Sequence, residues 1–392
     1  METPTCPSLL FPVTTGVLTT SYPRYPGDFA GCFVEDSVSA HVQAGETVEV
    51  IAAGAASEDE HGRHAQVRIL RVDVPAPQGA SPLFYGDGAP ETLERGGLAA
   101  WAQALFFWAG LCRRIHERAP AWDRVVAHWM VPCGLAAHAA APHLPLIVHA
   151  HSGDVALMER IPGGAALGRR LARSAAQLNF VSADLRDRFA GLTGIATGRV
   201  VRLGPSAQAT APGEDAAGRA PLRRSLGIDG PTILSAGRLV PIKGFDVLLR
   251  AVARAAADRG AGVDAPVTLV ILGEGPERPR LERMAARLGV DLRLPGVVPR
   301  GSVASWMRAA DVYAQPSRRL ATGRTEGLPI ATLEALAVGL PIVISRTGGL
   351  AELDGQPGVS VVPAEDTCAW AAALTAAVSR PEATPSRTRA GV

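Results

Sequence analysis

Apolar runs of strand length alternate with helical patterns along nearly the whole of this 392-residue chain. A strand buried on both faces is a short run of aliphatic residues, whereas a helix packed on a sheet repeats its apolar residues every three or four positions. Alternation of the two is typical of parallel sheets with helices on both faces. We therefore predict an α/β protein with doubly wound, Rossmann-like sheets.

The expected strands fall into two groups. The first comprises residues 16–20, 47–52, 67–72, 124–128, 144–149, 178–181 and 199–203, with helices such as 31–44 and 98–118 between them. The second comprises residues 232–236, 268–272, 292–294, 312–315, 341–345 and 359–362. Residues 205–230, rich in Pro, Ala and Gly, resemble a linker between the groups.

The chain is too long for one ordinary hydrophobic core, and the two groups of strands predict two domains. We expect a first domain over residues 1–205, a second over residues 206–380, and a disordered tail over residues 381–392. Ligands of such folds bind at the carboxyl ends of the strands, so a crevice between the two domains is the predicted site.

Charge and cysteine content narrow the class of protein. The 39 basic and 37 acidic residues leave a net charge of +2 without long runs of one sign, which gives no case for nucleic-acid binding. The five cysteines are scattered and form no Cys/His ligand cluster, which favours reduced thiols. Residues 1–15 lack the pattern of a signal peptide. We expect a cytoplasmic protein.

The most apolar stretch is residues 98–112, which is too short to cross a bilayer. Arg113 and Arg114 follow it and could touch anionic lipid at the inner face of the membrane. A buried helix of an α/β domain is the simpler interpretation, and peripheral membrane contact is the alternative.

Lys243 is the only lysine in a chain whose other basic residues are arginine. Such a position indicates a need for a compact ammonium on a flexible stem. The strand 232–236 leads into Gly237 and Arg238, and Lys243 precedes an amphipathic helix. A strand that delivers Arg and Lys to the start of a helix is typical of phosphate binding.

Two glutamates flank the expected start of another helix. Glu326 lies in the loop after strand 312–315, Pro329 suits a first helical position, and Glu334 falls in the second turn. Free backbone N–H groups there favour an anion, and carboxylates accept hydrogen bonds from vicinal hydroxyls. The pair thus predicts a ligand with both phosphate and hydroxyl groups. A simple complement to the helix dipole is the alternative.

The order of the motifs resembles the family 4 glycosyltransferases. The second half carries the specific ones: Gly237-Arg238-Leu239 with Lys243-Gly244, Gly273-Glu274-Gly275-Pro276-Glu277, Glu326 and Glu334 with seven residues between them, and Thr347-Gly348-Gly349-Leu350-Ala351-Glu352. The first half resembles the family more loosely, at residues 20–31, 128–134, 149–154 and 181–182. The resemblance implies a GT-B fold and a retaining enzyme that transfers a sugar from a nucleotide diphosphate to a saccharide, glycolipid or small-molecule acceptor.

The resemblance also implies roles for individual residues. Arg238 and Lys243 correspond to the residues that bind the donor diphosphate and stabilise the departing nucleotide. Glu326 corresponds to the residue that contacts the donor sugar, and Glu334 to the one that holds the ribose hydroxyls. The other donor-binding positions are Gly31 at the head of the first helix, Val298 at the nucleobase, and Gly327, Leu328, Pro329 and Ile330, which contribute backbone hydrogen bonds.

His151 corresponds to a family histidine near the sugar hydroxyls and the reaction centre. His149 lies two residues earlier on the same expected strand face, and a buried, hydrogen-bonded role explains either ring as well. The two histidines could also bind a metal ion, but the sequence offers no third ligand nearby. Because no Asp-x-Asp triplet occurs, we expect no metal and no cofactor beyond the nucleotide sugar.

Three rival functions remain open. The chain reads Leu203-Gly204-Pro205-Ser206 where the family has a different pattern, and it ends before the family's last helices, which allows a truncated, weakly active sugar-nucleotide-binding remnant. A GT-B sugar-nucleotide epimerase is the nearest enzymatic rival. A nicotinamide dehydrogenase is disfavoured, because no G-x-G-x-x-G follows the first strand.

Overall fold

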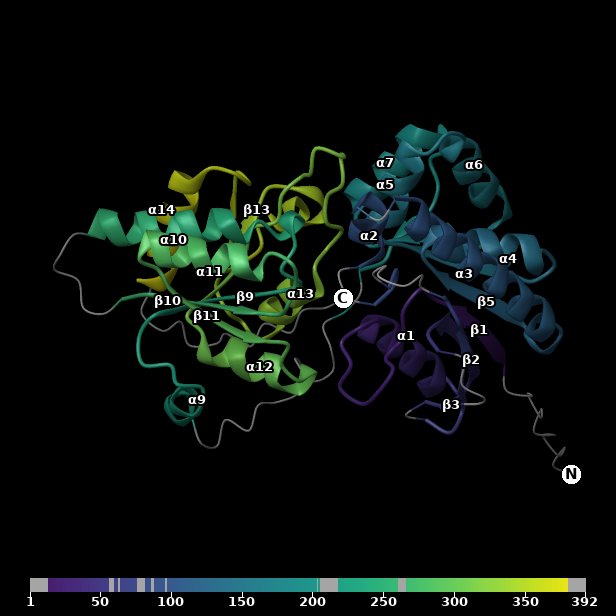
Figure 1. The fold of residues 1–392 in the computed structure, drawn as a ribbon, viewed down its shortest axis with the longest axis horizontal. Coiled ribbons are helices and arrows are strands. Elements are labelled where there is room, and N and C mark those ends of the chain that lie inside the picture. The colour runs from purple at the N-terminus through teal and green to yellow at the C-terminus, as the bar shows by residue number, and fades with distance from the viewer. Residues whose placement is uncertain are drawn as a thin grey trace, which may run out of the picture.

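Two α/β lobes lie side by side in the computed structural model, the first coloured purple to teal and the second green to yellow (Figure 1). The structure describes residues 13–55, 60–62, 64–75, 82–85, 88–95, 97–202, 204, 218–259 and 266–379. The expected tail 381–392 and most of the expected linker lie outside these residues. Each lobe is built on a sheet of its own, as the two groups of strands predicted.

The first sheet has the order β3-β4-β2-β1-β5-β6-β7-β8, and its strands pair in parallel except at β3, which is antiparallel to β4. The order reverses direction on either side of β1, so the topological switch point lies between β1 and β5. The strands are β1 Thr14–Leu18, β2 Thr47–Ala53, β3 Glu60–His61, β4 Val67–Val72, β5 Arg124–His128, β6 Leu146–Ala150, β7 Gln177–Phe180 and β8 Arg199–Val200.

Helices cover both faces of this sheet. Val17 packs toward α1 with Val34 and Val38, while its neighbour Leu18 packs on the opposite face with Phe107 of α3. This alternation is the period of two that a strand imposes on its side chains. The helices are α1 Cys32–Gln43, α2 Ala89–Arg95, α3 Gly97–Arg118, α4 Leu135–Ala140, α5 Ser152–Arg160, α6 Gly164–Ser174 and α7 Ala183–Thr193, with short turns at Ala119–Ala121 and Met130–Gly134.

The second sheet is parallel throughout, in the order β11-β10-β9-β12-β13-β14, with its switch point between β9 and β12. Its central strands are almost entirely buried, which explains their continuous apolar sequences. The strands are β9 Thr232–Ala236, β10 Thr268–Leu272, β11 Asp291–Gly296, β12 Val312–Gln315, β13 Ile342–Ser345 and β14 Val359–Val362.

This sheet also has a helical layer on each face. Ile233 packs against Leu248 of α10 and Trp370 of α14, whereas Leu234 packs with Met307 of α12 and Ala335 of α13 on the other face. The helices are α9 Arg219–Ser225, α10 Phe245–Arg259, α11 Arg278–Leu288, α12 Arg300–Ala309, α13 Ile330–Ala337 and α14 Thr367–Val378, with 3-10 turns at Pro241–Lys243 and Gly348–Leu353.

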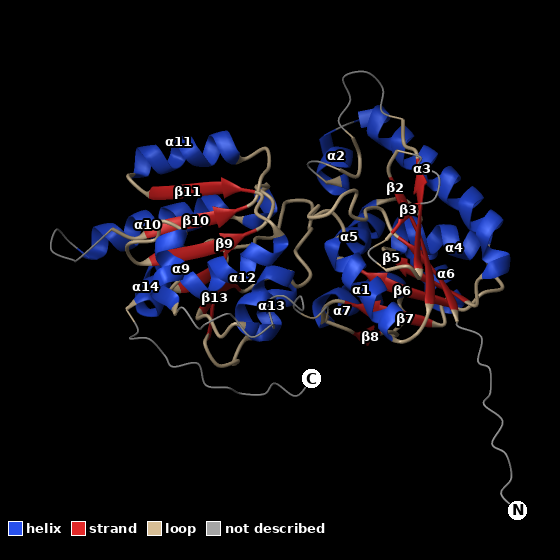
Figure 2. Cartoon of the chain, turned by 90° about the horizontal axis from the view of Figure 1, so that it is seen from below, coloured by secondary structure: helices blue, strands red, loops and turns tan. Residues whose placement is uncertain are grey.

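The carboxyl ends of both sheets point into the space between the lobes. In Figure 2 the arrows of β9, β10 and β11 run toward the first domain. The residues that follow these strands and those of the first sheet therefore meet at the junction of the lobes, where the sequence predicted the ligand crevice.

Some sequence expectations were wrong in detail. The helix α9 lies in the stretch expected to be linker, where Arg219 and Arg223 pair with Asp311 and so fix the helix to the second domain. The helix α11 begins at Arg278 with Pro279 in its first turn, so Pro276 precedes it. The edge strand β3 was not predicted, because two residues carry no periodic pattern.

Candidate active site

Polar contacts join the two lobes across the crevice. Arg300 at the start of α12 forms an ion pair with Asp36 of α1, with Nη1 2.8 Å from Oδ1. Arg188 of α7 donates to Thr325 Oγ1 at 2.9 Å, close to the predicted Glu326. The structure thus brings residues of both domains into direct contact where the lobes meet.

Lys243 and Glu326 meet at the centre of the second sheet's carboxyl edge. The Lys243 Nζ lies 2.6 Å from Glu326 Oε1, and the two side chains are only 14% and 15% exposed. Lys243 closes the 3-10 turn before α10, and Gly237 makes room for its stem, since a Cβ at Gly237 would lie 2.8 Å from Lys243 Cε. Two residues 83 positions apart are thereby brought into one ion pair.

A relay of hydrogen bonds holds the Glu326 carboxylate. The Tyr313 hydroxyl donates to Gln315 Oε1 at 2.7 Å, and Gln315 Nε2 donates to Ser317 Oγ at 2.9 Å. Ser317 Oγ then donates to Glu326 Oε2. Tyr313, Gln315 and Ser317 are spaced two residues apart, so their side chains lie on one face of the extended chain that runs through and beyond β12. Burial, and then the charge of Glu326, raise the pKa of Tyr313 far above its usual range, so its hydroxyl stays protonated.

Glycines of the family-like motifs let neighbouring loops touch this centre. A Cβ at Gly273 would lie 2.1 Å from the carbonyl oxygen of Gly237, beside Arg238. A Cβ at Gly348 would lie 2.2 Å from the carbonyl oxygen of Glu326, and one at Gly349 would lie 2.1 Å from that of Gly327. These positions exclude side chains, so the backbone of each motif packs directly on a loop that carries a predicted site residue.

The segment before α13 lies against the first domain. A Cβ at Gly327 would lie 2.6 Å from Val181 Cγ2 and 3.8 Å from Ser152 Cβ, at the ends of β7 and β6. Leu328 is buried, and Pro329 caps the helix, which begins at Ile330. The free N–H groups at this helix start therefore lie at the junction of the two domains, near the start of α5. The sequence predicted Pro329 as a first helical residue, but in the structure it is the residue before the helix.

Glu334 lies one turn into α13 and is buried. The Glu334 carboxylate interacts electrostatically with Cys32 and with Arg300, so Glu334 lies near the start of α1. Gly31 caps that helix with a left-handed φ of 72°, and a Cβ there would lie 2.2 Å from the carbonyl oxygen of Ser21. The structure thus brings both Glu334 and the start of α1, next to Gly31, near Arg300.

Val298 occupies a different part of the second domain. It follows β11 and packs, partly buried, on the cluster that contains Leu234 and Leu272. Its backbone lies at the carboxyl end of β11, on the opposite side of β9 from the Glu326 loop.

His151 is the N-cap residue directly before α5 and is almost completely buried. Its ring packs on Phe33 at a centroid distance of 5.0 Å and on Trp129 at 4.5 Å, and its Nε2 lies 3.4 Å from His128 Nδ1. Burial, and then the neighbouring His149, lower the pKa of His151 to about 3. The ring is therefore neutral near pH 7 and can exchange hydrogen bonds without carrying a charge.

Glu91 and Arg324, which no sequence motif indicated, lie close to Arg238. Arg238 Nη1 lies 3.3 Å from an oxygen of Glu91 in α2, and Arg324 pairs with the other oxygen of that carboxylate. Neither α2 nor the loop 318–325 shows a local pattern typical of a site, because the contact exists only when the two domains face each other.

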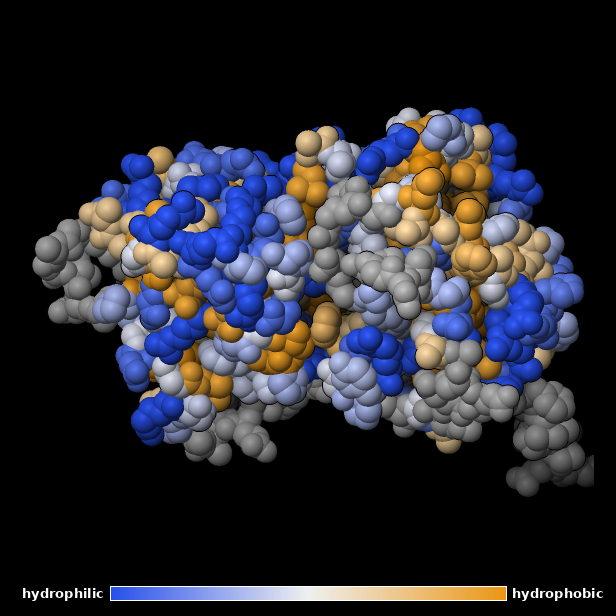
Figure 3. Space-filling view, viewed as in Figure 1, coloured by the Kyte–Doolittle hydropathy of each residue, from blue (hydrophilic) through white to orange (hydrophobic). Residues whose placement is uncertain are grey.

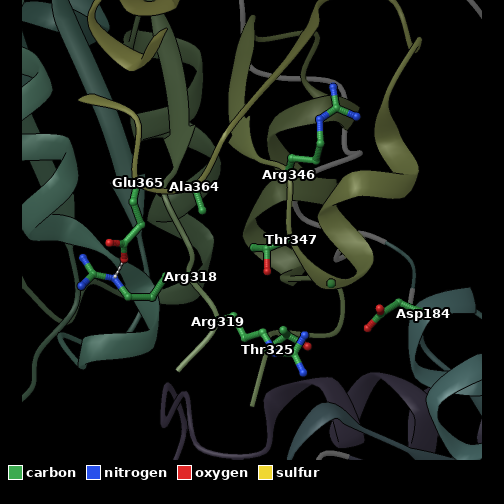
Figure 4. A pocket seen from close by; sticks show the side chains of 9 residues that line it. Asp184, Arg318, Arg319, Thr325, Arg346, Thr347, Ala364 and Glu365 are labelled. Atoms are coloured by element: carbon green, nitrogen blue, oxygen red, sulfur yellow. Dashed lines mark ion pairs between the residues drawn. The ribbon is translucent and has the colours of Figure 1, made fainter. Parts of the chain in front are cut away.

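A cavity of about 390 Å³ lies behind the Glu326 loop, and Figure 4 shows its lining. Arginine side chains from three positions dominate it, with Asp184 contributed by the first domain. The lining residues are Asp184, Arg318, Arg319, Thr325, Arg346, Thr347, Gly348, Ala364 and Glu365. None of the residues predicted for the donor is among the lining residues, although Thr325 directly precedes Glu326.

His128 stacks on both His149 and His151, with ring centroids 5.0 and 5.6 Å apart. Within the part of the chain that the structure describes, no group of three or more His, Cys, Asp and Glu side chains is placed to hold a metal ion. His149 lies instead beside Asn179, with 3.4 Å between the side-chain nitrogens.

Both halves of the chain match known protein families. Residues 31–205 match the family described as glycosyl transferase 4-like domain, and residues 230–380 match glycosyl transferases group 1. The boundary between the two matches falls between the two sheets.

Curated relatives are enzymes of sugar transfer. The chain is 35% identical over 255 residues to a GDP-mannose-dependent alpha-(1-6)-phosphatidylinositol monomannoside mannosyltransferase of Mycolicibacterium smegmatis, covering 63% of this chain and 64% of the relative. It is 36% identical over 192 residues to a D-inositol 3-phosphate glycosyltransferase of Saccharomonospora viridis, covering 47% and 42%. The chain thus spans less than two thirds of the length of these relatives.

Solved structures share the two-domain fold. Sucrose-phosphate synthase from Thermosynechococcus elongatus superposes with a TM-score of 0.71 at 18% identity, covering 93% of this chain and 89% of that one. A UDP-forming trehalose-phosphate synthase from Burkholderia xenovorans gives 0.71 at 17% identity, covering 94% and 92%. With the family matches over both halves, the chain belongs to the family 4 glycosyltransferases of the GT-B fold.

Proposed function

We propose that this protein is a retaining glycosyltransferase that moves a sugar from a nucleotide-diphosphate donor to a hydroxyl of an acceptor. The observation that carries the proposal is the meeting of Lys243 and Glu326 at the switch point of the second sheet, with Arg238 at the end of the neighbouring β9. An ammonium, a guanidinium and a carboxylate at this edge suit a ligand that joins a diphosphate to a sugar.

The charges of these side chains support separate roles in binding the diphosphate and the sugar. Negative charge develops on the leaving diphosphate, where Lys243 and Arg238 would stabilise it. Lys243 would then exchange its contact with Glu326 for a phosphate oxygen, and the freed carboxylate would accept hydrogen bonds from the sugar hydroxyls. His151, neutral and almost completely buried, would contact a sugar hydroxyl from the first domain.

The retaining step is proposed as a same-face displacement. The bond from the anomeric carbon to the phosphate oxygen breaks, and a bond from that carbon to the acceptor oxygen forms on the same face. The acceptor proton passes to the leaving phosphate, so no separate side-chain base is needed. The Glu326 carboxylate would hold the sugar in place while positive charge develops at the anomeric carbon.

The relatives suggest which substrates to try first. Their names specify GDP-mannose and acceptors that contain inositol and phosphate, and a structural neighbour from Anabaena was solved with UDP-glucose. We propose a UDP- or GDP-sugar donor and a saccharide, glycolipid or inositol-phosphate-type acceptor for this chain.

The direct test measures nucleoside diphosphate released from UDP-glucose, GDP-mannose and ADP-glucose, each with and without inositol phosphates, phosphatidylinositol mannosides and simple sugars. Acceptor-dependent release with an α-linked product supports the proposal. Isomerised donor without any acceptor would identify an epimerase instead, and tight donor binding without turnover would identify an inactive binding protein.

We further propose that transfer requires no metal ion, because side-chain cations and a helix N-terminus can neutralise the diphosphate. Dialysis against EDTA is expected to change kcat by less than about twofold. Restored activity on adding Mg²⁺ or Mn²⁺ to an EDTA-inactivated enzyme would contradict this expectation. Glu326→Ala treated in parallel controls for background donor hydrolysis.

The α3 helix suggests peripheral contact with the inner face of the membrane. Its inner side packs in the core, but Leu98, Leu105 and Phe106 are 90%, 67% and 60% exposed. Trp101 and Trp108 are also exposed, and Arg113 and Arg114 follow on the same helix. Figure 3 shows orange side chains over the part of the first domain where Figure 1 labels α3. No helix among the described residues is long and apolar enough to cross a bilayer.

An apolar stripe that ends in arginines suits the surface of an anionic bilayer. We expect the protein to float with vesicles of phosphatidylglycerol and not with vesicles of phosphatidylcholine. The triple variant Leu98→Ser, Leu105→Ser, Phe106→Ser should lose this binding while keeping its melting temperature, since these side chains are exposed. Leu288→Ser in the second domain, a leucine that is 38% exposed and lies outside α3, is the control. Equal flotation of the triple variant and wild type would refute the contact.

A further inference from the structure

Glu91 lies between two arginines of the opposite domain. It belongs to α2 of the first domain, yet one carboxylate oxygen pairs with Arg324 and the other lies 3.3 Å from Arg238 Nη1. The side chains of Glu91 and Arg324 are only 6% and 7% exposed. This three-residue cluster, called here the Glu91 bridge, is thus a link between the domains in which Glu91 and Arg324 are buried, whereas Arg238, a predicted donor residue, is 35% exposed.

The backbone of α2 is shaped around the Arg238 guanidinium. Gly88 precedes the helix with a φ of 101°, and a Cβ there would lie 2.0 Å from Arg238 Nη1 and 2.7 Å from its Cζ. A residue with a side chain would displace the guanidinium. Pro90 lies over the start of α5, with its Cγ 3.4 Å from the position of a Cβ at Gly153. The contact with Arg238 is therefore a packed one next to the His151 region, and not a loose surface pair.

We propose that Glu91 is a positioning residue that orients Arg238 toward the donor diphosphate when the crevice is closed. This inference rests on the proposed function. A guanidinium has several N–H donors in a rigid plane, so a carboxylate on one edge fixes the direction in which the others point. Because Glu91 comes from the first domain, Arg238 is held in this orientation only when the two domains meet.

The charge balance explains the second arginine. A carboxylate beside Arg238 would by itself cancel the cation that a diphosphate needs. Arg324 supplies a further positive charge, so the Glu91 bridge keeps a net charge of +1 and still attracts an anion. Nε and Nη1 of Arg324 are buried without a hydrogen-bond partner among the described residues, so its pairing with Glu91 is its main polar contact there.

The test compares nucleotide binding by the full-length wild type and Glu91→Gln, using calorimetry with UDP, GDP, UMP and GMP. Glutamine keeps the shape of the side chain and one hydrogen-bond acceptor but loses the charge. For whichever diphosphate binds the wild type, we expect Glu91→Gln to raise Kd about tenfold. The Kd of the matching monophosphate, which lacks the terminal phosphate, should change by less than about twofold.

Two controls separate positioning from a merely structural role. Asp36→Asn removes the carboxylate of another ion pair between the domains, that with Arg300, and should leave diphosphate binding near the wild-type value. In an Arg238→Met background, Glu91→Gln should have no further effect, since it acts through the arginine.

The outcomes are distinct. Unchanged or tighter diphosphate binding by Glu91→Gln, or equal weakening of monophosphate and diphosphate, would overturn the inference and leave the proposed function standing. A full effect of Glu91→Gln in the Arg238→Met background would overturn it as well. A wild type that binds none of the four nucleotides would instead overturn the proposed function, and this inference with it.

Discussion

Replacing Glu326 by alanine is expected to lower kcat by about a thousandfold while the protein stays folded. The carboxylate is held by Lys243 on one oxygen and by Ser317 on the other, at the end of the relay from Tyr313. Such a fixed group costs little reorganisation when charge develops on the sugar, and a water molecule in its place would not be held in the same way. The loss should appear in kcat and not only in KM.

Stability should fall only modestly in this variant. Glu326 lies in a loop at the crevice, and removing it leaves the Lys243 ammonium without its partner, which we expect to cost about 2 kcal/mol. This loss is a fraction of the free energy of unfolding of a typical domain, which is roughly 5–15 kcal/mol. The measurements are steady-state transfer rates and thermal melting. Glu282→Ala on the exposed face of α11 is the matched control, and it should retain the wild-type rate.

Glu326→Gln refines the same prediction. It keeps an acceptor for Ser317 but loses the charge, so it should fall between alanine and wild type. If Glu326→Ala transfers sugar at the wild-type rate, the carboxylate has no role in the reaction.

Much of the second domain could be predicted from sequence because its central strands are buried on both faces. β9, β10 and β12 have the bounds that their apolar runs indicated, at 232–236, 268–272 and 312–315. In such strands nearly every side chain is buried, so the apolar run in the local sequence coincides with the strand. Edge elements are different: β3 exists only through pairing with β4, and α9 depends on the ion pairs of its arginines with Asp311.

The positions of the candidate site residues were predictable where they lie at the ends of elements. Lys243, Glu326 and His151 each follow a strand or precede a helix, and a chain of alternating elements brings those ends to one edge. What no local pattern could supply was the partner of each group. The neutral state of His151 comes from burial against Phe33 and Trp129, which are distant in sequence.

The Glu91 bridge marks the limit of such reasoning. Its members are 147 and 233 residues from Glu91 along the chain. They meet only after both sheets have formed and the domains have closed on each other. A charged residue in a short helix is by far most often solvated, so a prediction that picked out Glu91 would have needed the geometry of the other domain.

Replacing Lys243 by arginine is expected to lower kcat/KM for the donor by about thirtyfold, although the charge is kept. The ammonium reaches Glu326 at 2.6 Å through a stem that lies against Gly237, where Lys243 Cε and a Cβ would be only 2.8 Å apart. A planar guanidinium is bulkier and cannot follow this path without moving the Gly237 turn, on which Gly273 also packs. The cation would therefore be displaced from the diphosphate.

Lys243→Met keeps most of the stem and removes the charge, so it should lose more, about a thousandfold. Arg254→Lys on the exposed side of α10 is the matched control for an exchange of the two basic residues, and it should change the rate by less than about twofold. Rates are compared at saturating acceptor with the donor concentration varied. A Lys243→Arg enzyme with unchanged kcat/KM would show that charge alone suffices at this position, and that the single lysine of the chain is an accident of its composition.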